Sequence, residues 1–370
     1  MKIAVLGSTG VIGTLTLELA EKYSVEVVAL AAGRNLSKLS EQIHRFRPRY
    51  VAVQRKEDAE KLGKGVLWGR EGLNALATLD EADLVVVGVS GTDGIEPTYM
   101  AARAGKRIAL ANKESLVSGG KVICETARKN SAFIIPVDSE HSSLFQLLLF
   151  PEQPQEIFLT ASGGPFFRGR PEVIRIEDVL SHPTWRMGKK ITVDSATLMN
   201  KAFEMVEARW LFNFPPERIK VLIHPQSAVH ALARMRDGTL FAHMGPADMR
   251  LPIQYALFYP ERKPPPSPPL HLENLGHLEF YPAPPEKYPT IDLGYRMMQE
   301  ACSLAAVING ANDFAVESFL EGKLNFDRIL DVIIEVSKVH RPYPLNTIDE
   351  VLEAVKEGRE RAREISGVKE

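Results

Sequence analysis

Short apolar runs alternate with helical patterns over roughly the first third of this 370-residue chain, and no other feature restricts its fold as strongly. Strands that alternate with helices pair in parallel, because the chain must cross back over the sheet before each new strand. The pattern therefore predicts an α/β fold with a doubly wound, Rossmann-type parallel sheet. Its strands are expected at residues 2–6, 25–30, 50–53, 84–87, 107–110 and 133–137.

The first predicted strand runs directly into a glycine turn that opens a helix. The sequence Gly7-Ser-Thr-Gly-Val-Ile-Gly13 places glycine at every third position. A helix N-terminus at this point can hold a pyrophosphate. A glycine triplet alone is a weak signal, and a tight turn without a ligand is the alternative. Its place between the first strand and the first helix favours dinucleotide binding. The predicted cofactor residues here are Gly7, Ser8, Thr9, Gly10, Val11, Ile12 and Gly13.

The end of the second predicted strand indicates which dinucleotide binds. NAD enzymes of this design usually place Asp or Glu there, whereas this chain has Ala31-Ala-Gly-Arg-Asn35. No carboxylate is present to repel a 2′-phosphate, and the planar cation of Arg34 suits that phosphate. The segment therefore favours NADP(H), with an exposed loop charge as the alternative explanation for Arg34.

Two further loops follow predicted strands, at the edge where ligands bind in open sheets. They are residues 88–91 and the segment Ala111-Asn-Lys-Glu114. From this edge Lys113 could reach a substrate hydroxyl, or it could have a structural role.

The stretch from Ile191 to Glu207 is predicted to be one capped helix, with Asp194 or Ser195 as its N-cap. At about 100° per residue its apolar and polar side chains fall on opposite sides. The polar side could carry chemistry, or it could be the solvated face of a surface helix. It holds Asn200, Lys201, Glu204 and Glu207.

An apolar run that starts at Phe133 ends in Asp138 and Glu140. Alternation would put both carboxylates on one face if the strand geometry persisted. If Glu204 joined them, like charges about 4 Å apart would repel by roughly 4 kcal/mol at an effective dielectric of 20, so the cluster would need a cation or a shared proton. Oxygen ligands favour Mg²⁺ or Mn²⁺ over zinc. The alternative is that Asp138 and Ser139 simply cap a helix through residues 144–149.

From about residue 156 the pattern becomes mixed and predicts an α+β domain with strands at 157–161 and 220–223. Asp237-Gly238 between two alternating runs predicts a hairpin, and one face of the sheet would be free for a partner. Ser162-Gly-Gly offers a hydroxyl and unobstructed N–H groups, although it could be a plain tight turn. A phosphate site is predicted from Ser162, Ser195, Asn200 and Lys201.

Residues 181–190 combine Pro183 and Gly188 with large apolar side chains and several cations. Because Trp185 and Met187 have no obvious core period, we predict a lid that closes over bound substrate and excludes water. His182 could be a donor that faces the ligand. The alternative is a loop whose Trp185 docks permanently on the domain.

Proline dominates residues 264–289, with nine prolines in 26 residues. Such a segment cannot be a helix or a central strand, so it is predicted to run extended between domains. Thr347-Ile-Asp-Glu350 forms a capping box on the last of four helical patterns, and their short connections indicate an antiparallel bundle. The patterns cover 293–308, 313–321, 327–340 and 348–365. The predicted domains are 1–148 for NADPH binding, 149–263 for catalysis with the lid at 181–190, a linker at 264–290 and a helical bundle at 291–370.

The formal net charge is −2, so no global field attracts the chain to nucleic acid or to a membrane surface. No apolar run approaches the roughly 20 residues that span a bilayer. The two cysteines, Cys124 and Cys302, lie far apart in apolar helical settings, which is typical of reduced thiols in a cytoplasmic protein.

Taken together, the motifs closely resemble those of the 1-deoxy-D-xylulose 5-phosphate reductoisomerase family over nearly the whole chain. The resemblance rests on the glycine turn and on Ala111-Asn-Lys-Glu-Ser115, Val137-Asp-Ser-Glu-His141, Ser162-Gly-Gly164, Ser181-His-Pro183 with Trp185, Val193-Asp-Ser-Ala-Thr197, Asn200-Lys201 with Glu204, and His224-Pro-Gln-Ser227.

The resemblance implies a role for each matching residue. It implies that Asp138, Glu140 and Glu204 bind a divalent metal, and that Lys113, Glu140, His182 and Trp185 serve catalysis. Substrate binding is implied for Ser139, Ser162, His182, Ser195, Asn200, Lys201 and Glu204, with Glu207 nearby. Cofactor binding is implied for Gly33, Arg34, Asn35, Asn112, Lys113 and Glu114 besides the glycine turn. Residues 91–96 are given no role.

By resemblance the substrate is a ketose phosphate that undergoes retro-aldol cleavage and recombination before NADPH reduces the resulting aldehyde. The family and the free sheet face also suggest a homodimer. Two other classes fit parts of the chain. A semialdehyde or homoserine dehydrogenase-like enzyme would share only the nucleotide domain, and an acylating member would need a nucleophilic cysteine. An NADP-binding regulator would not need three carboxylates and a phosphate cluster.

Overall fold

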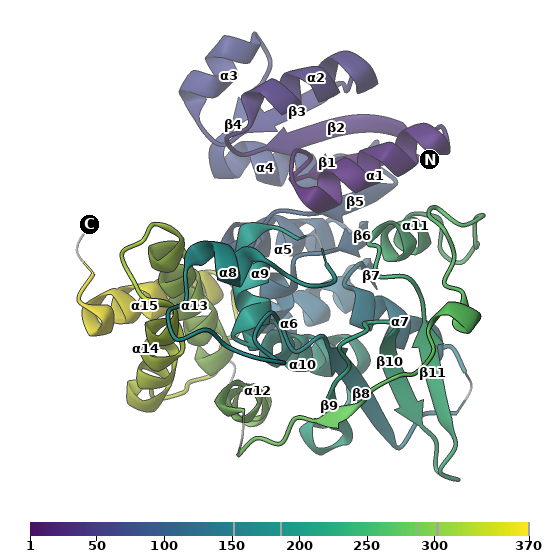
Figure 1. Cartoon of the computed structure of the whole chain (residues 1–370). Helices are drawn as coiled ribbons and strands as arrows, with labels where there is room; N and C mark the ends of the chain where they lie inside the picture. The colour runs from purple at the N-terminus through teal and green to yellow at the C-terminus, as the bar shows by residue number, and fades with distance from the viewer. Residues whose placement is uncertain (151, 186, 287, 301–302, 369–370) are drawn as a thin grey trace. The chain divides into compact units, whose positions relative to one another are not determined.

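The computed structural model describes residues 1–150, 152–185, 187–286, 288–300 and 303–368, and its internal contacts divide the chain into two compact units. Unit 1 contains residues 1–115, 123–142 and 249–268, and unit 2 contains 116–122, 143–248 and 269–370. Figure 1 labels the elements of both. No described helix is long and apolar enough to cross a membrane.

Unit 1 is built on a seven-stranded sheet whose neighbouring strands are all parallel, which confirms the doubly wound fold. The strand order β4-β3-β2-β1-β5-β6-β7 reverses direction at β1, and this switch point is where such sheets bind ligands. The strands are β1 (Lys2–Leu6), β2 (Glu26–Ala32), β3 (Tyr50–Val53), β4 (Leu67–Trp68), β5 (Leu84–Val87), β6 (Arg107–Leu110) and β7 (Phe133–Pro136).

All six predicted strands of unit 1 are present, and β4 is an addition that the sequence did not reveal. A strand of two residues is too short to show alternation. The helices that connect the strands are α1 (Val11–Lys22), α2 (Leu36–Phe46), α3 (Lys56–Leu62), α4 (Gly69–Ala77), α5 (Ile95–Arg103) after the short turn η1 (Gly91–Gly94), and α6 (Lys113–Lys129).

Helix α11 (Arg250–Phe258) also belongs to unit 1, although the sequence assigned residues 249–263 to the catalytic domain. It packs against α1, β6 and β7. Ile253, Ala256 and Leu257 lie in the same buried core as the apolar residues of β1. The chain then passes into unit 2 within the proline-rich segment, between Pro268 and Pro269.

Unit 2 is built on a mixed five-stranded sheet in the order β11-β10-β8-β9-β12. The predicted hairpin is present, since Asp237-Gly238 joins two antiparallel strands and Gly238 adopts a φ of +88°. Short β12 occupies an edge, where its proline costs no ladder hydrogen bond. The strands are β8 (Glu156–Ala161), β9 (Ile219–Ile223), β10 (Val229–Arg234), β11 (Leu240–Met244) and β12 (Tyr281–Pro282).

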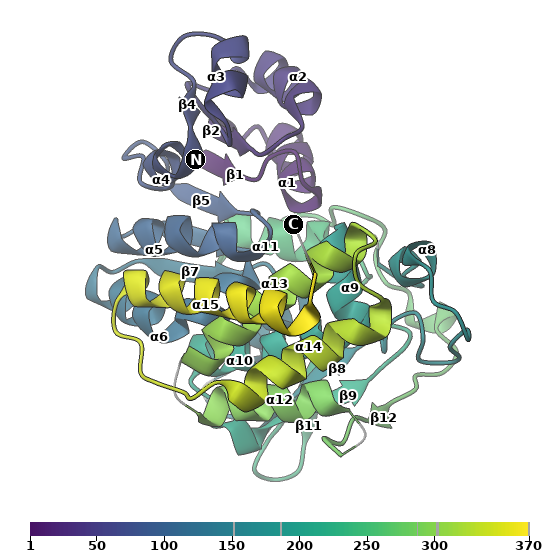
Figure 2. The same ribbon diagram turned by 90° about the vertical axis from the view of Figure 1, so that its left-hand side faces the viewer.

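Helices complete unit 2. Helix α10 (Met199–Phe212) packs on β8 and β9, and α12 (Pro289–Gln299) packs on α10. In Figure 2, α13 (Ser303–Leu320), α14 (Phe326–Val339) and α15 (Ile348–Ser366) lie side by side as a C-terminal group, and the contacts among them agree. The capping box on α15 is confirmed, because the Thr347 side chain accepts from the Glu350 N–H and the Glu350 carboxylate accepts from the Thr347 N–H.

Two predicted helices of the C-terminal group were wrong in their bounds. The pattern 293–308 is divided between α12 and α13, and α13 continues through the position where a break was expected at 309–312. Asn309 and Asn312 lie in this stretch, and both side chains are fully buried. Asn309 donates to the Ser118 side chain and Asn312 to the Asp194 side chain. Because these amides have hydrogen-bond partners, the helix can continue through a polar stretch in the protein interior.

The predicted helix 191–207 is two helices, α9 (Lys189–Ala196) and α10, with a break at Thr197 and Leu198. Leu198 takes the left-handed conformation at φ +61°, and its N–H bonds to the carbonyl of Ser195. Asp194 and Ser195 therefore lie in the last turn of α9 and do not cap the helix. The pattern of polar residues continues on both sides of the break, which is why periodicity alone did not reveal it.

Candidate active site

The glycine turn of unit 1 has the close backbone approach that a dinucleotide site needs. A Cβ atom on Gly13 would lie 2.3 Å from the Gly7 carbonyl oxygen, and one on Gly7 would lie 2.5 Å from that of Gly88. Gly7 also has a φ of +87°, which a side chain would strain. Helix α1 starts at Val11, so its free N–H groups face the end of β1 as predicted.

Helix α2 holds this turn in place. The Gln42 side chain donates to the Ser8 carbonyl at 2.9 Å, and Lys38 donates to the Thr14 hydroxyl at 2.6 Å. The Ser8 hydroxyl and the Gln42 Oε1 are buried with no hydrogen-bond partner in the protein. Buried polar atoms without a partner are rare, and they are suited to a polar ligand. The role of Gln42 in holding the glycine turn was not predicted from the sequence.

Arg34 lies exposed directly after β2, and Asn35 caps α2 by accepting from the Lys38 N–H at 3.1 Å. The cap fixes the backbone on one side of Arg34, while the guanidinium remains accessible to solvent. This arrangement leaves a cation at the position where the ribose of a bound dinucleotide lies in doubly wound folds.

Asn112 caps α6 in the way that Asn35 caps α2. Its Oδ1 accepts from the Ser115 N–H at 3.0 Å, and its amide nitrogen donates to the carbonyls of Val89 and Gly91. Glu114 accepts a further bond from the same amide at 3.0 Å. The residues 111–114 and 88–91 are therefore tied together at the carboxyl ends of β5 and β6.

Ser162 follows the last residue of β8 and forms a small hydrogen-bonded network. Its hydroxyl oxygen lies 3.0 Å from the His182 Nε2 and accepts from the Gly164 N–H at 3.2 Å. The His182 Nδ1 accepts from the N–H groups of Thr184 and Trp185, so the ring proton is on Nε2 and points at Ser162. Burial lowers the pKa of His182, which favours this neutral form. With two donors aimed at it, the Ser162 hydroxyl has its own proton free for a ligand.

The Ser162 turn lies against α9. Gly163 and Gly164 have φ values of +85° and +71°, and a Cβ on Gly164 would lie 2.9 Å from the Ser195 carbonyl oxygen. The turn and the last turn of α9 are thus brought together as the predicted phosphate site requires. Ser195 itself is half-buried.

The polar side of α10 is buried, so the solvated surface helix is excluded. Lys201, Glu204 and Glu207 are each at most 2% exposed. The Glu204 carboxylate accepts from the Asn200 amide at 2.5 Å and pairs with the Lys201 ammonium. The Asn200 Oδ1 is buried without a protein partner. Buried charges persist only when they are paired or bind a ligand, so this face of α10 is built for polar contacts.

The predicted strand alternation at Asp138 and Glu140 was wrong, because β7 ends at Pro136 and α7 (Ser139–Leu147) starts at once. The Asp138 Oδ1 accepts from the Glu140 N–H at 3.2 Å, so Asp138 caps the helix as the alternative proposed. Glu140 lies in the first turn, where its carboxylate accepts from the Ser139 hydroxyl at 2.5 Å. A cap and a functional carboxylate are not exclusive, since a carboxylate has two oxygens and each can accept more than one contact.

The second oxygen of Asp138, Oδ2, pairs with the Lys113 ammonium at 2.7 Å, and both side chains are at least nine-tenths buried. The His141 Nδ1 lies 2.9 Å from the Oδ1. Lys113 therefore has a structural partner, and it also places an ammonium directly beside Asp138. The ammonium thus gives a largely buried carboxylate a partner of opposite charge.

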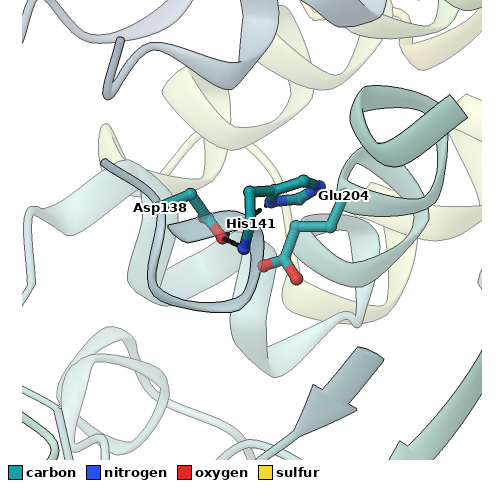
Figure 3. A group of neighbouring side chains, drawn as sticks. All are labelled: Asp138, His141 and Glu204. Atoms are coloured by element: carbon teal, nitrogen blue, oxygen red, sulfur yellow. Dashed lines mark hydrogen bonds and ion pairs between the residues drawn. The ribbon is translucent and has the colours of Figure 1, made fainter. Parts of the chain in front are cut away.

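Among the described residues, Asp138, His141 and Glu204 form a group that could hold a metal ion. One ligand atom from each lies within 4.8 Å of the others (Figure 3). Figure 3 draws the three side chains and shows the Asp138 carboxylate bonded to the His141 ring. Two of the three predicted metal ligands are thus in this group. His141 was missed because the start of α7 was predicted too late, so the i, i+3 relation to Asp138 was hidden.

The lid segment lies between α8 (Ile176–Leu180) and α9, and Arg186 lies outside the described residues. Trp185 is half-buried, with its ring centroid 5.9 Å from that of His230. Its backbone N–H bonds to His182, which links the two predicted lid residues. His230, on β10, is a further neighbour that the sequence did not single out.

A Rossmann-type sheet with a glycine turn at its switch point, and a second unit with hydroxyl, ammonium and carboxylate groups, define a dinucleotide-dependent oxidoreductase. Models of one family match most of the chain. The model described as 1-deoxy-D-xylulose 5-phosphate reductoisomerase matches residues 3–120, and those of its C-terminal domains match 134–212 and 244–361.

Individual relatives agree with the family models. The 1-deoxy-D-xylulose 5-phosphate reductoisomerase of Geotalea uraniireducens is 45% identical over 99% of this chain and 99% of its own. That of Thermomicrobium roseum is 47% identical over 99% of this chain and 97% of its own. A crystal structure of DOX-P reductoisomerase in complex with NADPH, fosmidomycin and magnesium has a TM-score of 0.94 at 32% identity, covering 99% of this chain and 98% of that one. The chain belongs to the 1-deoxy-D-xylulose 5-phosphate reductoisomerase family and is an NADP-dependent oxidoreductase.

Proposed function

We propose that this chain converts 1-deoxy-D-xylulose 5-phosphate to 2-C-methyl-D-erythritol 4-phosphate with NADPH and a divalent cation, in non-mevalonate isoprenoid synthesis. The observation that carries the proposal is the buried polar face of α10 beside the Ser162 turn. A regulator that only binds NADP has no need of buried Lys201, Glu204 and Glu207. The family membership supports the same reaction, and two structures of the family are described as complexes with NADPH.

NADPH binds in unit 1 through the glycine turn and the loops at the same sheet edge. The N–H groups at the start of α1 hold the pyrophosphate, and Arg34 binds the 2′-phosphate. The cofactor residues are Gly7, Ser8, Thr9, Gly10, Val11, Ile12, Gly13, Gly33, Arg34, Asn35, Asn112, Lys113 and Glu114.

The substrate phosphate binds to residues of the Ser162 turn, α9 and α10. The Ser162 hydroxyl has a proton free for an anionic oxygen, and the Lys201 ammonium supplies charge. Ser195 and Asn200 complete the phosphate site. His182 sets the orientation of Ser162, while Ser139 and Glu207 lie near the carbon backbone of the substrate.

Asp138, Glu140 and Glu204 are the proposed ligands of a hard divalent ion, Mg²⁺ or Mn²⁺. The donors fit such an ion, because each of two carboxylates already has a cation beside it: Lys113 beside Asp138, and Lys201 beside Glu204. When bound, the ion supplies Lewis-acid polarisation of the ketone and hydroxyl oxygens. His141 acts through its bond to the Asp138 carboxylate, which orients that ligand.

The protein residues position the fragments during the rearrangement. The C3–C4 bond of the ketose phosphate breaks and a new carbon–carbon bond forms, so the phosphate anchor must keep both fragments in place. Lys113 and Glu140 lie beside the reacting atoms, where each can hold a proton. Residues 181–190 close as a lid, with Trp185 and His182 excluding water. Bound NADPH would supply the hydride that reduces the aldehyde carbon.

Loss of NADPH absorbance with the ketose phosphate and Mg²⁺ tests the proposed reaction. Asp138→Asn, Glu140→Gln and Glu204→Gln should each abolish most turnover while NADPH still binds, because the glycine turn and Arg34 are not among the metal ligands. Full activity of an EDTA-treated, demonstrably metal-free protein would remove the metal from the proposal. Unchanged kinetics of the Arg34→Asp variant with both NADPH and NADH would remove Arg34 from the cofactor site.

The same proposal includes a homodimer that assembles on the edge of the unit 2 sheet. Strand β11 is an edge strand, and Leu240 and Phe241 on it are 51% and 39% exposed. Phe150 stacks on Phe241 at a centroid distance of 5.1 Å and is itself 48% exposed. An exposed apolar edge usually pairs with another chain. We also propose a cytoplasmic location, as the wide separation of the two cysteines in the sequence indicates; Cys302 lies outside the described residues.

A further inference from the structure

One carboxylate in the proline-rich segment gathers more partners than a spacer requires. Glu279 precedes β12, and its side chain is 23% exposed. Its Oε2 accepts from Arg168 at 2.6 Å and from the Gln226 amide at 2.7 Å, and its Oε1 accepts from the Tyr281 hydroxyl at 2.7 Å. These donors come from three segments of unit 2 that are far apart in sequence. Glu279 is therefore the point at which the segments meet.

The His224-Pro-Gln-Ser227 motif, which has no part in the proposed chemistry, binds the same short segment. The His224 Nε2 accepts from the N–H groups of Ala228 and Val229, so the proton is on Nδ1, which donates to the Glu279 carbonyl at 2.8 Å. The His224 ring stacks on Phe280 at 4.5 Å and 10°. Burial lowers the pKa of His224, which keeps this neutral tautomer. The motif thus holds residues 279–280 by backbone, side-chain and ring contacts.

The held segment reaches the Ser162 turn by two routes. Tyr281 packs on Phe167 at a centroid distance of 5.2 Å, and it pairs with Ile223 in the β9–β12 ladder. Both Phe167 and Ile223 press directly on the turn, because a Cβ on Gly163 would lie 2.7 Å from the Phe167 ring and 2.9 Å from the Ile223 side chain. Arg168, the partner of Glu279, follows Phe167 in the chain. Displacing Glu279 would therefore release the outer side of the turn.

We propose that Glu279 is a positioning residue for substrate phosphate, which acts by holding Phe167 and Arg168 so that the Ser162-Gly-Gly164 turn keeps its binding conformation. The inference rests on the proposed phosphate role of Ser162. Glu279 touches no substrate itself. It sets the affinity for the phosphate end and leaves the cofactor site of unit 1 unaffected.

The test compares Glu279→Ala with wild type in steady-state kinetics. The KM for the ketose phosphate should rise about three- to tenfold, as expected when a few hydrogen bonds that preorganise a binding turn are lost. The kcat and the KM for NADPH should change by less than about twofold, since the reacting groups remain in place. Glu279→Gln keeps an acceptor for Tyr281 and should recover part of the loss.

Two controls separate positioning from general loosening. Arg168→Ala and the double variant with Glu279→Ala should show effects that do not add, because both substitutions break the same pair. Asp327→Ala removes the Arg170–Asp327 ion pair, which ties the same chain segment to α14 farther from Ser162. That variant should keep the wild-type KM. An equal rise in Asp327→Ala, or an unchanged KM in folded Glu279→Ala, would overturn the inference.

A failure of the proposed function would give a different result. If wild-type protein does not turn over the ketose phosphate, the binding of inorganic phosphate to wild type and Glu279→Ala is compared by calorimetry. Weaker binding to the variant supports the positioning role. Equal binding, or no binding to either protein, overturns it.

Discussion

Replacing Gly164 with alanine tests whether the Ser162 turn must lie against α9. Gly164 has a φ of +71°, and its added Cβ would lie 2.9 Å from the Ser195 carbonyl oxygen and 3.1 Å from the Ala196 Cα. Ordinary contacts begin near 3.4 Å, so the new atom overlaps the backbone by about 0.5 Å. Backbone atoms of a packed helix cannot turn aside as a flexible side chain can. The turn and the helix end must therefore separate.

The size of the effect follows from two contributions. An alanine in the left-handed region costs about 1 kcal/mol, and overpacking against fixed atoms costs about 1–3 kcal/mol. If the chain relieves most of this by moving the turn, the loss appears as weaker phosphate binding. A loss of about 2 kcal/mol corresponds to a KM for the ketose phosphate that is roughly 30-fold higher. The KM for NADPH should stay within about twofold, because the cofactor residues lie in unit 1.

The assay is the loss of NADPH absorbance over a range of ketose phosphate concentrations, with thermal unfolding recorded to show that the variant is folded. Gly169→Ala is the matched control, since a Cβ at that position has nothing within 4 Å and no positive φ to strain it. A folded Gly164→Ala protein with the wild-type KM would refute the reasoning. So would an equal rise in the control.

Three further predictions concern other parts of the chain. Arg34→Asp should raise the KM for NADPH by at least about tenfold and improve NADH relative to it, as loss of a phosphate-binding cation implies, and steady-state kinetics with both cofactors measures this. Burial, chiefly, lowers the pKa of His230 from 6.5 to about 4. The unfolded chain then binds this proton more readily than the folded chain. The free energy of unfolding should therefore fall by about 3 kcal/mol as the pH drops from 6.5 to 4 and then level off. Urea titrations at several pH values should show this fall in the wild type and a smaller one in His230→Gln. Gly310→Ala would place a Cβ 1.9 Å from the Val355 carbonyl oxygen, so α13 and α15 must separate. Its free energy of unfolding, measured by urea titration, should fall by at least about 2 kcal/mol, whereas that of Gly169→Ala should not change.

Local patterns in the sequence were sufficient for the architecture of unit 1. The strands that bracket Gly7–Gly13 are continuous apolar runs, as expected when both faces of a parallel sheet are covered. Gly13 is required by its contact with Gly7 in the same turn, whereas Gly7 also meets Gly88, which follows β5. The same holds for the hairpin at Asp237-Gly238 and for the Thr347 capping box, because turns and caps depend on neighbouring residues. Such features leave a local signal, so they could be predicted without the fold.

Features that depend on distant residues left no such signal. The break at Leu198 interrupts neither the polarity pattern nor the helix propensity. The buried amides of Asn309 and Asn312 are stable because they donate hydrogen bonds to the side chains of Ser118 and Asp194. The burial of Lys201 and Glu204 likewise depends on packing by residues far away in the sequence, so a surface helix could not be excluded from the sequence. Long-range packing alone decided these points.

The sequence by itself determined the fold class, the cofactor turn and the types of residue available for phosphate and metal binding, since each rests on chemistry carried by a short motif. The tertiary structure decided which of those residues meet and in what form. It placed the His182 proton on the nitrogen that faces Ser162, turned Asp138 into a helix cap paired with Lys113, and added His141 to the acids. The physical reason is that hydrogen-bond partners and burial are set by atoms that only the folded chain brings within reach.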